Sequence, residues 1–358
     1  MKILLRAPIG TTSGYGRDGV GIIRSLLKRE HEVDLYPEAV SPPLPQEVAN
    51  LLTYPISSGY DLEIHHVPPT GAQTGQYNKT RSKKVVLWTM WEWDTFPLSV
   101  PNRDIAETYI KHYDHVVGYT QQTLDSMKEF LGEGQATSVV QGGFEKEPWF
   151  PAEGTAWEKH FPSRKHGQMP FRFAMVGHLA ARKNPYTVLR AFNSLKEEMG
   201  DDFNAELLIK TGFPLVPPNY DAPGVKFIQE IGWSDELLRQ FYWSIDCLVN
   251  CAWGEGKDLP PMEATMSGTP VLLNDNPGHR GWVHPGILPL VPSTTMEMGE
   301  GYVGRFTGVD DTKKAMLEVY NNKALAYDRA KQLASYIEKR ATWDYRIQKF
   351  GEAVGVNL

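Results

Sequence analysis

Two glutamates that stand eight positions apart, Glu255 and Glu263, are the residues whose type and spacing point most directly to chemistry. Between them lie Gly256 and the pair Pro260-Pro261, and an apolar run follows. Because proline is favoured at the first helical position, we expect a loop that leads into a helix. The free N–H groups of such a helix start bind anions, most often phosphate. Carboxylates on both sides of a phosphate site favour a ligand that also carries hydroxyls, as a nucleotide-sugar does.

The backbone groups that we expect to hold the phosphates come from one short segment. They are the N–H groups of Gly256, Lys257, Asp258 and Leu259. This segment follows a strand expected over residues 247–250, and open α/β sheets bind ligands at the carboxyl ends of their strands. His279 comes after the next expected strand, residues 269–273, so we expect it on the same side of the sheet.

Length and composition limit the classes to which the protein can belong. The chain has 358 residues, enough for about two domains, and 41% hydrophobic residues, which indicates a folded globular protein. It contains no apolar run of about 18 residues that would indicate a transmembrane helix. The two cysteines, Cys247 and Cys251, suit a reducing cytoplasm and have no neighbouring ligands for zinc. The formal net charge of −6 disfavours a protein held on nucleic acid by its own field.

The chain opens twice with a strand, a loop and a helix. Residues 1–7 are expected to form a strand, a glycine-rich loop follows over residues 10–16, and a helix comes after it. Residues 171–176 are expected to form another strand, and Asn184-Pro185 is typical of a helix start. Two such openings predict two α/β domains, each with a mostly parallel sheet.

We predict the boundary between the two domains in a stretch rich in Pro, Gly, Lys and Glu. The predicted domains are a Rossmann-like N-terminal domain, residues 1–160, and a second Rossmann-like domain, residues 161–340. Residues 341–358 are expected to form a C-terminal helix that crosses back to the N-terminal domain. The two sheets would then face each other across a cleft.

The chain resembles the retaining, nucleotide-sugar-dependent glycosyltransferases of the GT-B fold, specifically the family 4-like group also called glycosyl transferases group 1. That group's motif is a Glu, seven residues and a Glu, in a context such as E-G-F-G-L-P-P-L-E-A. Here it reads Glu255-Gly-Lys-Asp-Leu-Pro-Pro-Met-Glu263-Ala264. The group's upstream loop, of the type G-R-x-x-x-x-K-G, is matched by residues 177–184. The resemblance covers most of the chain and is strongest over residues 171–283.

The resemblance implies that the N-terminal domain lies on the acceptor side and that the C-terminal domain binds the donor. It also implies roles for individual residues. Glu263 is expected to bind the ribose hydroxyls and Glu255 to face the transferred sugar. Lys183, with Arg182, is expected to hold the diphosphate. Gly14 and Gly16 are expected to let the N-terminal loop approach the donor.

The implied reaction is the transfer of a sugar from a UDP- or GDP-sugar to a hydroxyl group, with retention of configuration. Departure of the nucleoside diphosphate builds negative charge on the phosphate, and fixed cations and N–H groups stabilise that charge. No metal and no other cofactor is expected. The acceptor is left open among a glycan, a lipid-linked sugar, a protein and a modified base of DNA.

The chain departs from the family's pattern in three ways. The usual Arg after Gly177 is His178, which makes one diphosphate ligand weaker or pH-dependent. The usual Phe-Gly inside the motif is Lys257-Asp258, which places a carboxylate close to the phosphates. A His that several relatives carry after an N-terminal strand is absent, and Glu92 is the nearest polar candidate for the acceptor side.

Two other functions remain open at this point. Residues 14–19 match the pattern G-x-G-x-x-G, and Asp34 lies 20 residues after Gly14, as in an NAD-dependent oxidoreductase. The first glycine does not follow the strand directly, however, and Asp34 lies inside an expected strand. The second alternative is a protein that binds a nucleotide-sugar without catalysis, because His178 and Asp258 have weakened its site.

Overall fold

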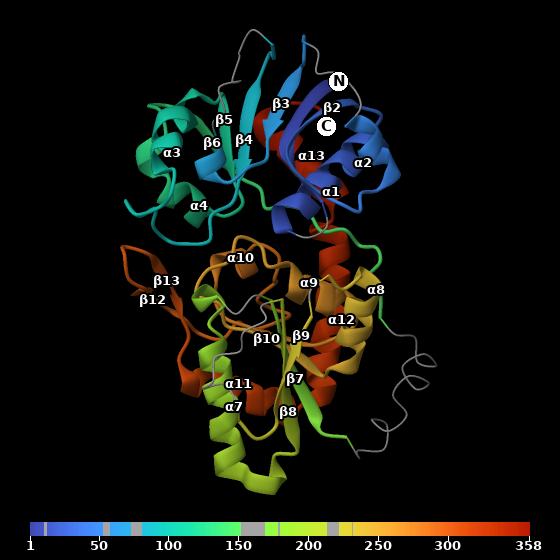
Figure 1. The fold of residues 1–358 in the computed structure, drawn as a ribbon, viewed down its shortest axis with the longest axis vertical. Helices are drawn as coiled ribbons and strands as arrows, with labels where there is room; N and C mark the ends of the chain where they lie inside the picture. The colour runs from blue at the N-terminus through green and yellow to red at the C-terminus, as the bar shows by residue number, and fades with distance from the viewer. Residues whose placement is uncertain are drawn as a thin grey trace.

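The chain folds into two α/β domains, which lie one above the other in Figure 1. The computed structural model describes residues 1–10, 13–52, 58–72, 81–151, 169–177, 180–212, 222–230 and 232–358. Each domain is built on a central sheet whose strands all pair in parallel. The predicted fold class, two parallel-sheet α/β domains, is therefore confirmed.

The N-terminal sheet has the strand order β2-β1-β3-β4-β5-β6. Its strands are β1 (Lys2–Gly10), β2 (Glu32–Ser41), β3 (Leu62–His65), β4 (Val85–Thr89), β5 (His115–Gly118) and β6 (Ala136–Val139). Its helices are α1 (Gly14–Lys28), α2 (Gln46–Leu51), α3 (Arg103–Tyr109) and α4 (Gln121–Ser126), with short 3-10 turns at η1 (Pro69–Gly71), η2 (Ile110–His112) and η3 (Lys128–Phe130).

The C-terminal sheet has the strand order β11-β10-β7-β8-β9. Its strands are β7 (Phe171–Val176), β8 (Ala205–Thr211), β9 (Val225–Gln229), β10 (Cys247–Asn250) and β11 (Val271–Leu273). Its helices are α7 (Pro185–Met199), α8 (Asp235–Ser244), α9 (Leu259–Met266), α10 (Pro277–Arg280), α11 (Val309–Asn321) and α12 (Lys323–Arg340), with 3-10 turns at η4 (Ala181–Lys183) and η5 (Gly200–Asp202). A separate hairpin of β12 (Thr294–Glu297) and β13 (Val303–Phe306) projects beside the domain junction (Figure 1).

Helix α1 begins inside the segment that was predicted as a glycine-rich loop. Gly14 is its first residue, and the N–H of Gly16 donates to the hydroxyl of the capping Ser13 at 3.0 Å. A Cβ atom at Gly19 would collide with the carbonyl oxygen of Pro8 on β1. The glycines therefore let the helix lie directly against the first strand, which a loop prediction from composition did not anticipate.

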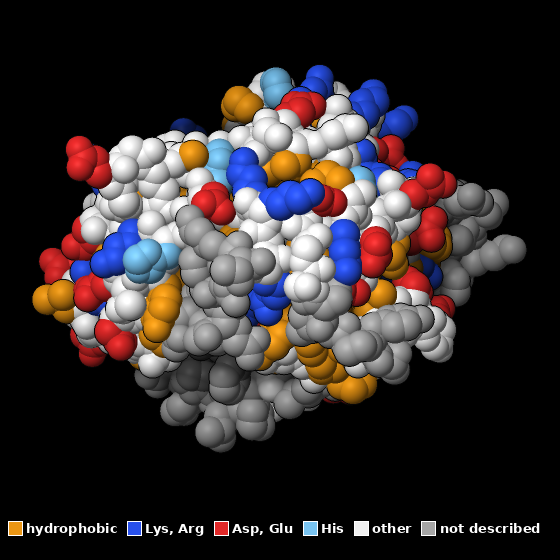
Figure 2. Space-filling view, turned by 90° about the horizontal axis from the view of Figure 1, so that it is seen from above, with side chains coloured by type: hydrophobic (Ala, Val, Ile, Leu, Met, Phe, Trp, Pro, Cys, Tyr) orange, Lys and Arg blue, Asp and Glu red, His pale blue; other side chains and the backbone are white. Residues whose placement is uncertain are grey.

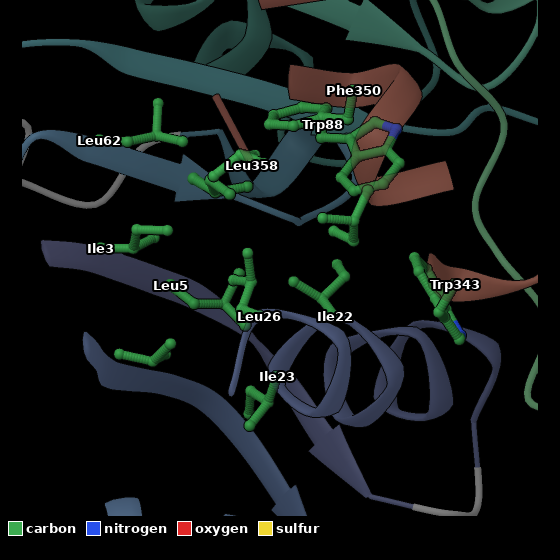
Figure 3. Packing of buried hydrophobic residues seen from close by; sticks show 14 of the residues in the cluster. Ile3, Leu5, Ile22, Ile23, Leu26, Leu62, Trp88, Trp343, Phe350 and Leu358 are labelled. Atoms are coloured by element: carbon green, nitrogen blue, oxygen red, sulfur yellow. The ribbon is translucent and has the colours of Figure 1, made fainter. Parts of the chain in front are cut away.

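The last helix, α13 (Trp343–Val354), packs into the N-terminal domain although it ends the chain. Figure 3 shows Trp343 and Phe350 of this helix facing Ile22 of α1 and Trp88 of β4. The rings of Trp88 and Phe350 are stacked with centroids 4.4 Å apart. Trp88 is fully buried in this core. Because α12 packs in the C-terminal core through Leu333, the chain ties the two domains together a second time.

None of the described helices has both the length and the apolar character that a bilayer-spanning helix needs.

Candidate active site

The loop that joins β10 to α9, residues 251–258, lies at the junction of the two domains. A Cβ atom at Gly254 would collide with the carbonyl oxygen of Glu92, and one at Gly256 would lie 2.8 Å from the sulfur of Met90. Both Met90 and Glu92 follow the carboxyl end of β4 in the N-terminal domain. The two sheets therefore present their carboxyl ends to each other here, and the absence of side chains on both glycines permits the close approach.

Arg182 and Lys183 are held directly against Glu255. The Lys183 ammonium donates to Glu255 Oε1 at 2.5 Å, and Arg182 Nη1 donates to Glu255 Oε2 at 3.2 Å. Glu255 is only 4% exposed, and the two cations compensate its buried negative charge. Burial alone would lower the pKa of Lys183, but the carboxylates of Glu255 and Asp258 outweigh it and raise that pKa. The two carboxylates therefore favour the charged form of Lys183 at this loop.

The turn η4, which carries these cations, is fastened to the neighbouring loop by the backbone. The N–H of Trp253 donates to the carbonyl of Arg182 at 2.7 Å, and the side-chain amide of Asn184 donates to the carbonyl of Cys251 at 3.1 Å. Asn184 also caps α7, as its position before a proline predicted. Two loops from separate strands thus meet as one rigid unit.

Asp258, one of the departures from the pattern of the family that the chain resembles, is buried beneath Lys183. Its backbone has φ = +70°, a conformation that is uncommon for residues other than glycine. Its carboxylate accepts hydrogen bonds from the Asn250 amide at 2.5 Å and from His279 Nε2 at 3.0 Å, and it lies 3.6 Å from Lys183 Nζ. These contacts compensate both the buried charge and the backbone strain.

His279 carries a positive charge in this arrangement. Its Nδ1 is 2.9 Å from the carbonyl oxygen of Asn274, and its Nε2 is 3.0 Å from the Asp258 carboxylate. Both partners are acceptors, so both ring nitrogens carry protons. Burial alone would lower the pKa of His279, but Asp258 outweighs it and raises that pKa. Burial alone would raise the pKa of Asp258, and Lys183 and His279 reverse that effect.

Glu263 lies on the first turns of α9 and faces a cavity between the domains. Its Oε2 accepts a hydrogen bond from the Tyr242 hydroxyl at 2.8 Å, and its Oε1 lies 3.7 Å from Arg17 Nη1. Arg17 also donates to Asp235 at 2.5 Å. The cavity has a volume of about 220 Å³ and is lined by Glu263, Arg17 and Leu259 among other residues. Burial raises the pKa of Glu263 despite the opposing charge of Arg17.

Lys257 points away from the other members of its loop. Its ammonium forms a buried ion pair with Asp18 of α1 and donates to the carbonyl of Gly143 at 2.8 Å. It also lies 5.1 Å from the centre of the Trp343 ring. The side chain of Lys257 therefore belongs to the junction with the N-terminal domain, while its backbone stays beside Glu255.

The remaining predicted site residues have different placements. Glu92 lies at the edge of the cluster, 3.7 Å from Arg182 Nη2. Gly14 and Gly16 lie in the first turn of α1, and a Cβ at Gly14 would meet open space. Leu259 is the first residue of α9 and lines the cavity beside Glu263. His178 lies outside the described residues.

Several residues that complete the site were not predicted from the sequence. They are Arg17, Asp18, Tyr242 and Asn250. The available signal for Arg17 and Asp18 was that they directly follow Gly16, at the start of a helix beside the cleft. Among the described residues, no three His, Cys, Asp or Glu side chains converge as a metal site would require.

We predict that the pKa values of His279 and His66 are shifted in opposite directions from the ordinary histidine pKa of about 6.5. His279 should titrate above that value, whereas burial lowers the pKa of His66 to about 4. The pKa of His279 is higher in the folded protein than in the unfolded chain. Protonated His279 therefore stabilises the fold fully at a pH below the pKa of the unfolded chain, and this stabilisation is lost as the pH rises through the pKa of the folded protein.

Histidine-selective NMR over pH 4–9 measures both values, and Asp258→Asn should lower only that of His279. The wild type should have a higher free energy of unfolding than His279→Gln, and this difference should become smaller as the pH rises above 6.5. A His279 signal that titrates below pH 6 would contradict the assigned charge.

One protein family matches part of the chain by sequence. Residues 170–319 match the sequence model of the family Glycosyl transferases group 1. No curated protein sequence matches the chain significantly.

Solved structures with the same fold cover nearly the whole chain. HepE of Anabaena, solved with UDP and glucose, is 14% identical with a TM-score of 0.68, and 99% of each chain is covered. Sucrose-phosphate synthase of Thermosynechococcus elongatus is 14% identical with a TM-score of 0.68, and the match covers 98% of this chain and 97% of that one. A UDP-forming α,α-trehalose-phosphate synthase of Burkholderia vietnamiensis is 11% identical with a TM-score of 0.67, and 99% of each chain is covered.

The matched family covers the sheet, the cation loop and the glutamate motif of the C-terminal domain, and the structural matches extend over both domains. The chain thus has the GT-B fold, and its residues 170–319 match the family of the glycosyl transferases group 1.

Proposed function

We propose that this enzyme transfers a sugar from a UDP- or GDP-sugar to a hydroxyl group, with retention of configuration and without a metal ion. The observation that carries this proposal is the pairing of Arg182 and Lys183 with Glu255 at the loop that leads into α9. Two fixed cations beside a helix N-terminus suit a diphosphate, and the adjoining carboxylate suits sugar hydroxyls. UDP is the favoured nucleotide, since HepE was solved with UDP and glucose.

The charges of the site support an exchange of partners when the donor binds. Three cationic side chains, those of Arg182, Lys183 and His279, face three carboxylates, those of Glu92, Glu255 and Asp258. An arriving diphosphate adds negative charge, so Lys183 and Arg182 turn from Glu255 to the phosphate oxygens. Glu255 is then released to accept hydrogen bonds from the sugar.

The same groups act when the bond to the leaving group breaks. Negative charge grows on the phosphate as the nucleoside diphosphate departs, and Lys183, Arg182 and the N–H groups at the start of α9 stabilise it. These fixed charges supply the stabilisation for which other enzymes use a metal. Glu92, on the N-terminal side of the cleft, is the proposed residue for orienting the acceptor hydroxyl.

The cavity beside Glu263 supports the placement of the nucleoside. Its volume of about 220 Å³ leaves room for a ribose next to the Glu263 carboxylate, and Arg17 lines the same cavity with Nη1 3.7 Å from that carboxylate. The donor would then run from this cavity along the start of α9 to Glu255. Glu263 therefore serves binding, and Lys183 serves the chemical step.

The two alternative functions have less structural support. The glycines of residues 14–19 lie within α1 instead of a loop between strand and helix, and Asp34 accepts a hydrogen bond from the Tyr60 hydroxyl at 2.6 Å. Neither placement suits the dinucleotide fingerprint of an oxidoreductase. A non-catalytic binder is disfavoured because Asp258 is compensated by Asn250 and His279 and leaves the cations in place.

The acceptor is proposed to be a glycan, a lipid-linked sugar or a protein in preference to a base of DNA. The net charge is −6, and Figure 2 shows Lys and Arg interspersed with Asp and Glu on the described part of the face seen from above. Nucleic acid favours a continuous basic surface. We place the enzyme in the cytoplasm, because Cys247 and Cys251 are free and buried thiols.

Incubation with a panel of UDP- and GDP-sugars tests the proposed reaction. We expect slow hydrolysis of one donor without an acceptor, full activity in EDTA, and product of unchanged anomeric configuration by NMR. Inversion of the anomeric centre, or activity abolished by EDTA, would contradict the proposed mechanism. Nucleotide binding with no turnover under any acceptor would favour the non-catalytic alternative.

Substitution of two residues should separate chemistry from donor binding. Lys183→Ala should lower kcat by about 100-fold or more with a smaller change in donor KM, because its charge acts mainly in the transition state. Glu263→Ala should raise donor KM by about 10- to 100-fold, the worth of hydrogen bonds to a charged group. Lys331→Ala, on the exposed face of α12, is the control and should leave both constants unchanged. Unchanged turnover in Lys183→Ala would show that the diphosphate lies elsewhere.

A further inference from the structure

Lys257 stands between Glu255 and the start of α9, yet its ammonium reaches the N-terminal side of the junction. Its ammonium pairs with Asp18 on α1, donates to the carbonyl of Gly143, and lies 5.1 Å from the ring of Trp343 on α13. Lys257 and Asp18 are 3% and 1% exposed, so this is a desolvated ion pair. Removing one partner of such a pair leaves an uncompensated buried charge.

Asp18 depends on Lys257 for its counter-charge. Its Oδ2 accepts a hydrogen bond from the Tyr119 hydroxyl at 2.7 Å, which is neutral, and His66 Nε2 lies 3.8 Å away. His66 donates from Nδ1 to the carbonyl of Trp88 at 2.9 Å. Because burial holds the pKa of His66 at about 4, that ring is neutral at physiological pH. Among the described groups around Asp18, Lys257 therefore supplies the positive charge.

The backbone of Lys257 is fixed to its own domain while its side chain is fixed to the other. Its carbonyl accepts a hydrogen bond from the indole N–H of Trp282 at 2.9 Å, and Trp282 is fully buried. The adjacent Gly256 packs against Met90 of the N-terminal domain. A movement that separates the domains must therefore break the ion pair or pull the loop away from Trp282.

We propose that Lys257 is a positioning residue, which uses Asp18 to draw residues 254–258 onto the N-terminal domain and so completes the donor site only when the domains are closed. This inference rests on the proposed function, because the loop it positions carries Glu255 and the N–H groups assigned to the donor. Opening exposes both charges to water, and closing pairs them. The pair therefore couples closure to the correct placement of Glu255.

A conformational experiment tests this coupling without any donor. The substitutions T108C and E197C place one cysteine at an exposed position of each domain. The two cysteines can be labelled with a pair of dyes for fluorescence resonance energy transfer, since the native cysteines are buried. Lys257→Met and Asp18→Asn should each shift the transfer efficiency toward separated domains. The double variant, which removes both charges, should return most of the way to the wild-type efficiency.

Arg305→Gln is the matched control. Arg305 pairs with Asp94 across the same junction at 3.0 Å, but the pair lies at its rim, with side chains 23% and 16% exposed. This substitution should shift the transfer efficiency by less than a third of the Lys257→Met effect. Equal shifts, or wild-type efficiency in both single variants, would overturn the proposal.

Kinetics then separates positioning from a merely structural role. With the donor that the panel identifies, each single variant should lose 100-fold or more in kcat/KM, mostly in kcat, while the Kd for the nucleoside diphosphate of that donor changes less than threefold. The double variant should recover at least tenfold over either single variant. A double variant no better than the single ones, with all variants folded by circular dichroism, would overturn the coupling.

The two proposals fail in different ways. If the wild type neither binds nucleotides nor turns over any donor, the proposed function fails, and the fluorescence shifts still report on the pair. If the wild type is active but Lys257→Met keeps its kcat, the positioning role fails and the proposed function stands.

Discussion

Charges that are buried where the two domains meet must be paired, and most features of this site follow from that constraint. Taking an ion out of water costs several kcal/mol unless a partner of opposite charge and hydrogen bonds compensate it. Glu255 meets that requirement with Lys183 and Arg182, Asp258 with His279 and Asn250, and Asp18 with Lys257. In the function that we propose, a diphosphate ligand enters this balanced network by replacing a carboxylate as the partner of the cations.

The two parallel sheets supply the geometry that the charges need. Their carboxyl ends face each other, so loops from β4, β7 and β10 meet in one place. The glycines at 254 and 256 remove the side chains that would keep the loops apart, and α13 returns to the N-terminal core through Trp343 and Phe350. The positions of the charged groups are thus set by packing that lies outside the site itself.

The sequence predicted the elements better than the contacts between them. Strand periodicity, the Asn184-Pro185 helix start and the Glu255–Glu263 motif are local signals, and they predicted two mostly parallel sheets. The partner of Lys257 was not predictable, because Asp18 lies 239 residues away and no local pattern links the two. Asp258 was expected to be unfavourable beside a phosphate, whereas its burial between Asn250 and His279 compensates it. The helical position of Gly14 and Gly16 was missed because a glycine-rich composition is typical of loops.

A crystal structure of the enzyme with a UDP- or GDP-sugar that it binds tests most directly whether the Lys183–Glu255 pair is the diphosphate site. We expect phosphate oxygens within hydrogen-bond distance of Lys183 Nζ and the N–H groups at the start of α9, with Glu255 turned to the sugar. The Asp258–His279 and Lys257–Asp18 pairs should remain intact. A donor bound elsewhere, with the Lys183–Glu255 ion pair unbroken, would contradict the proposed role of this network.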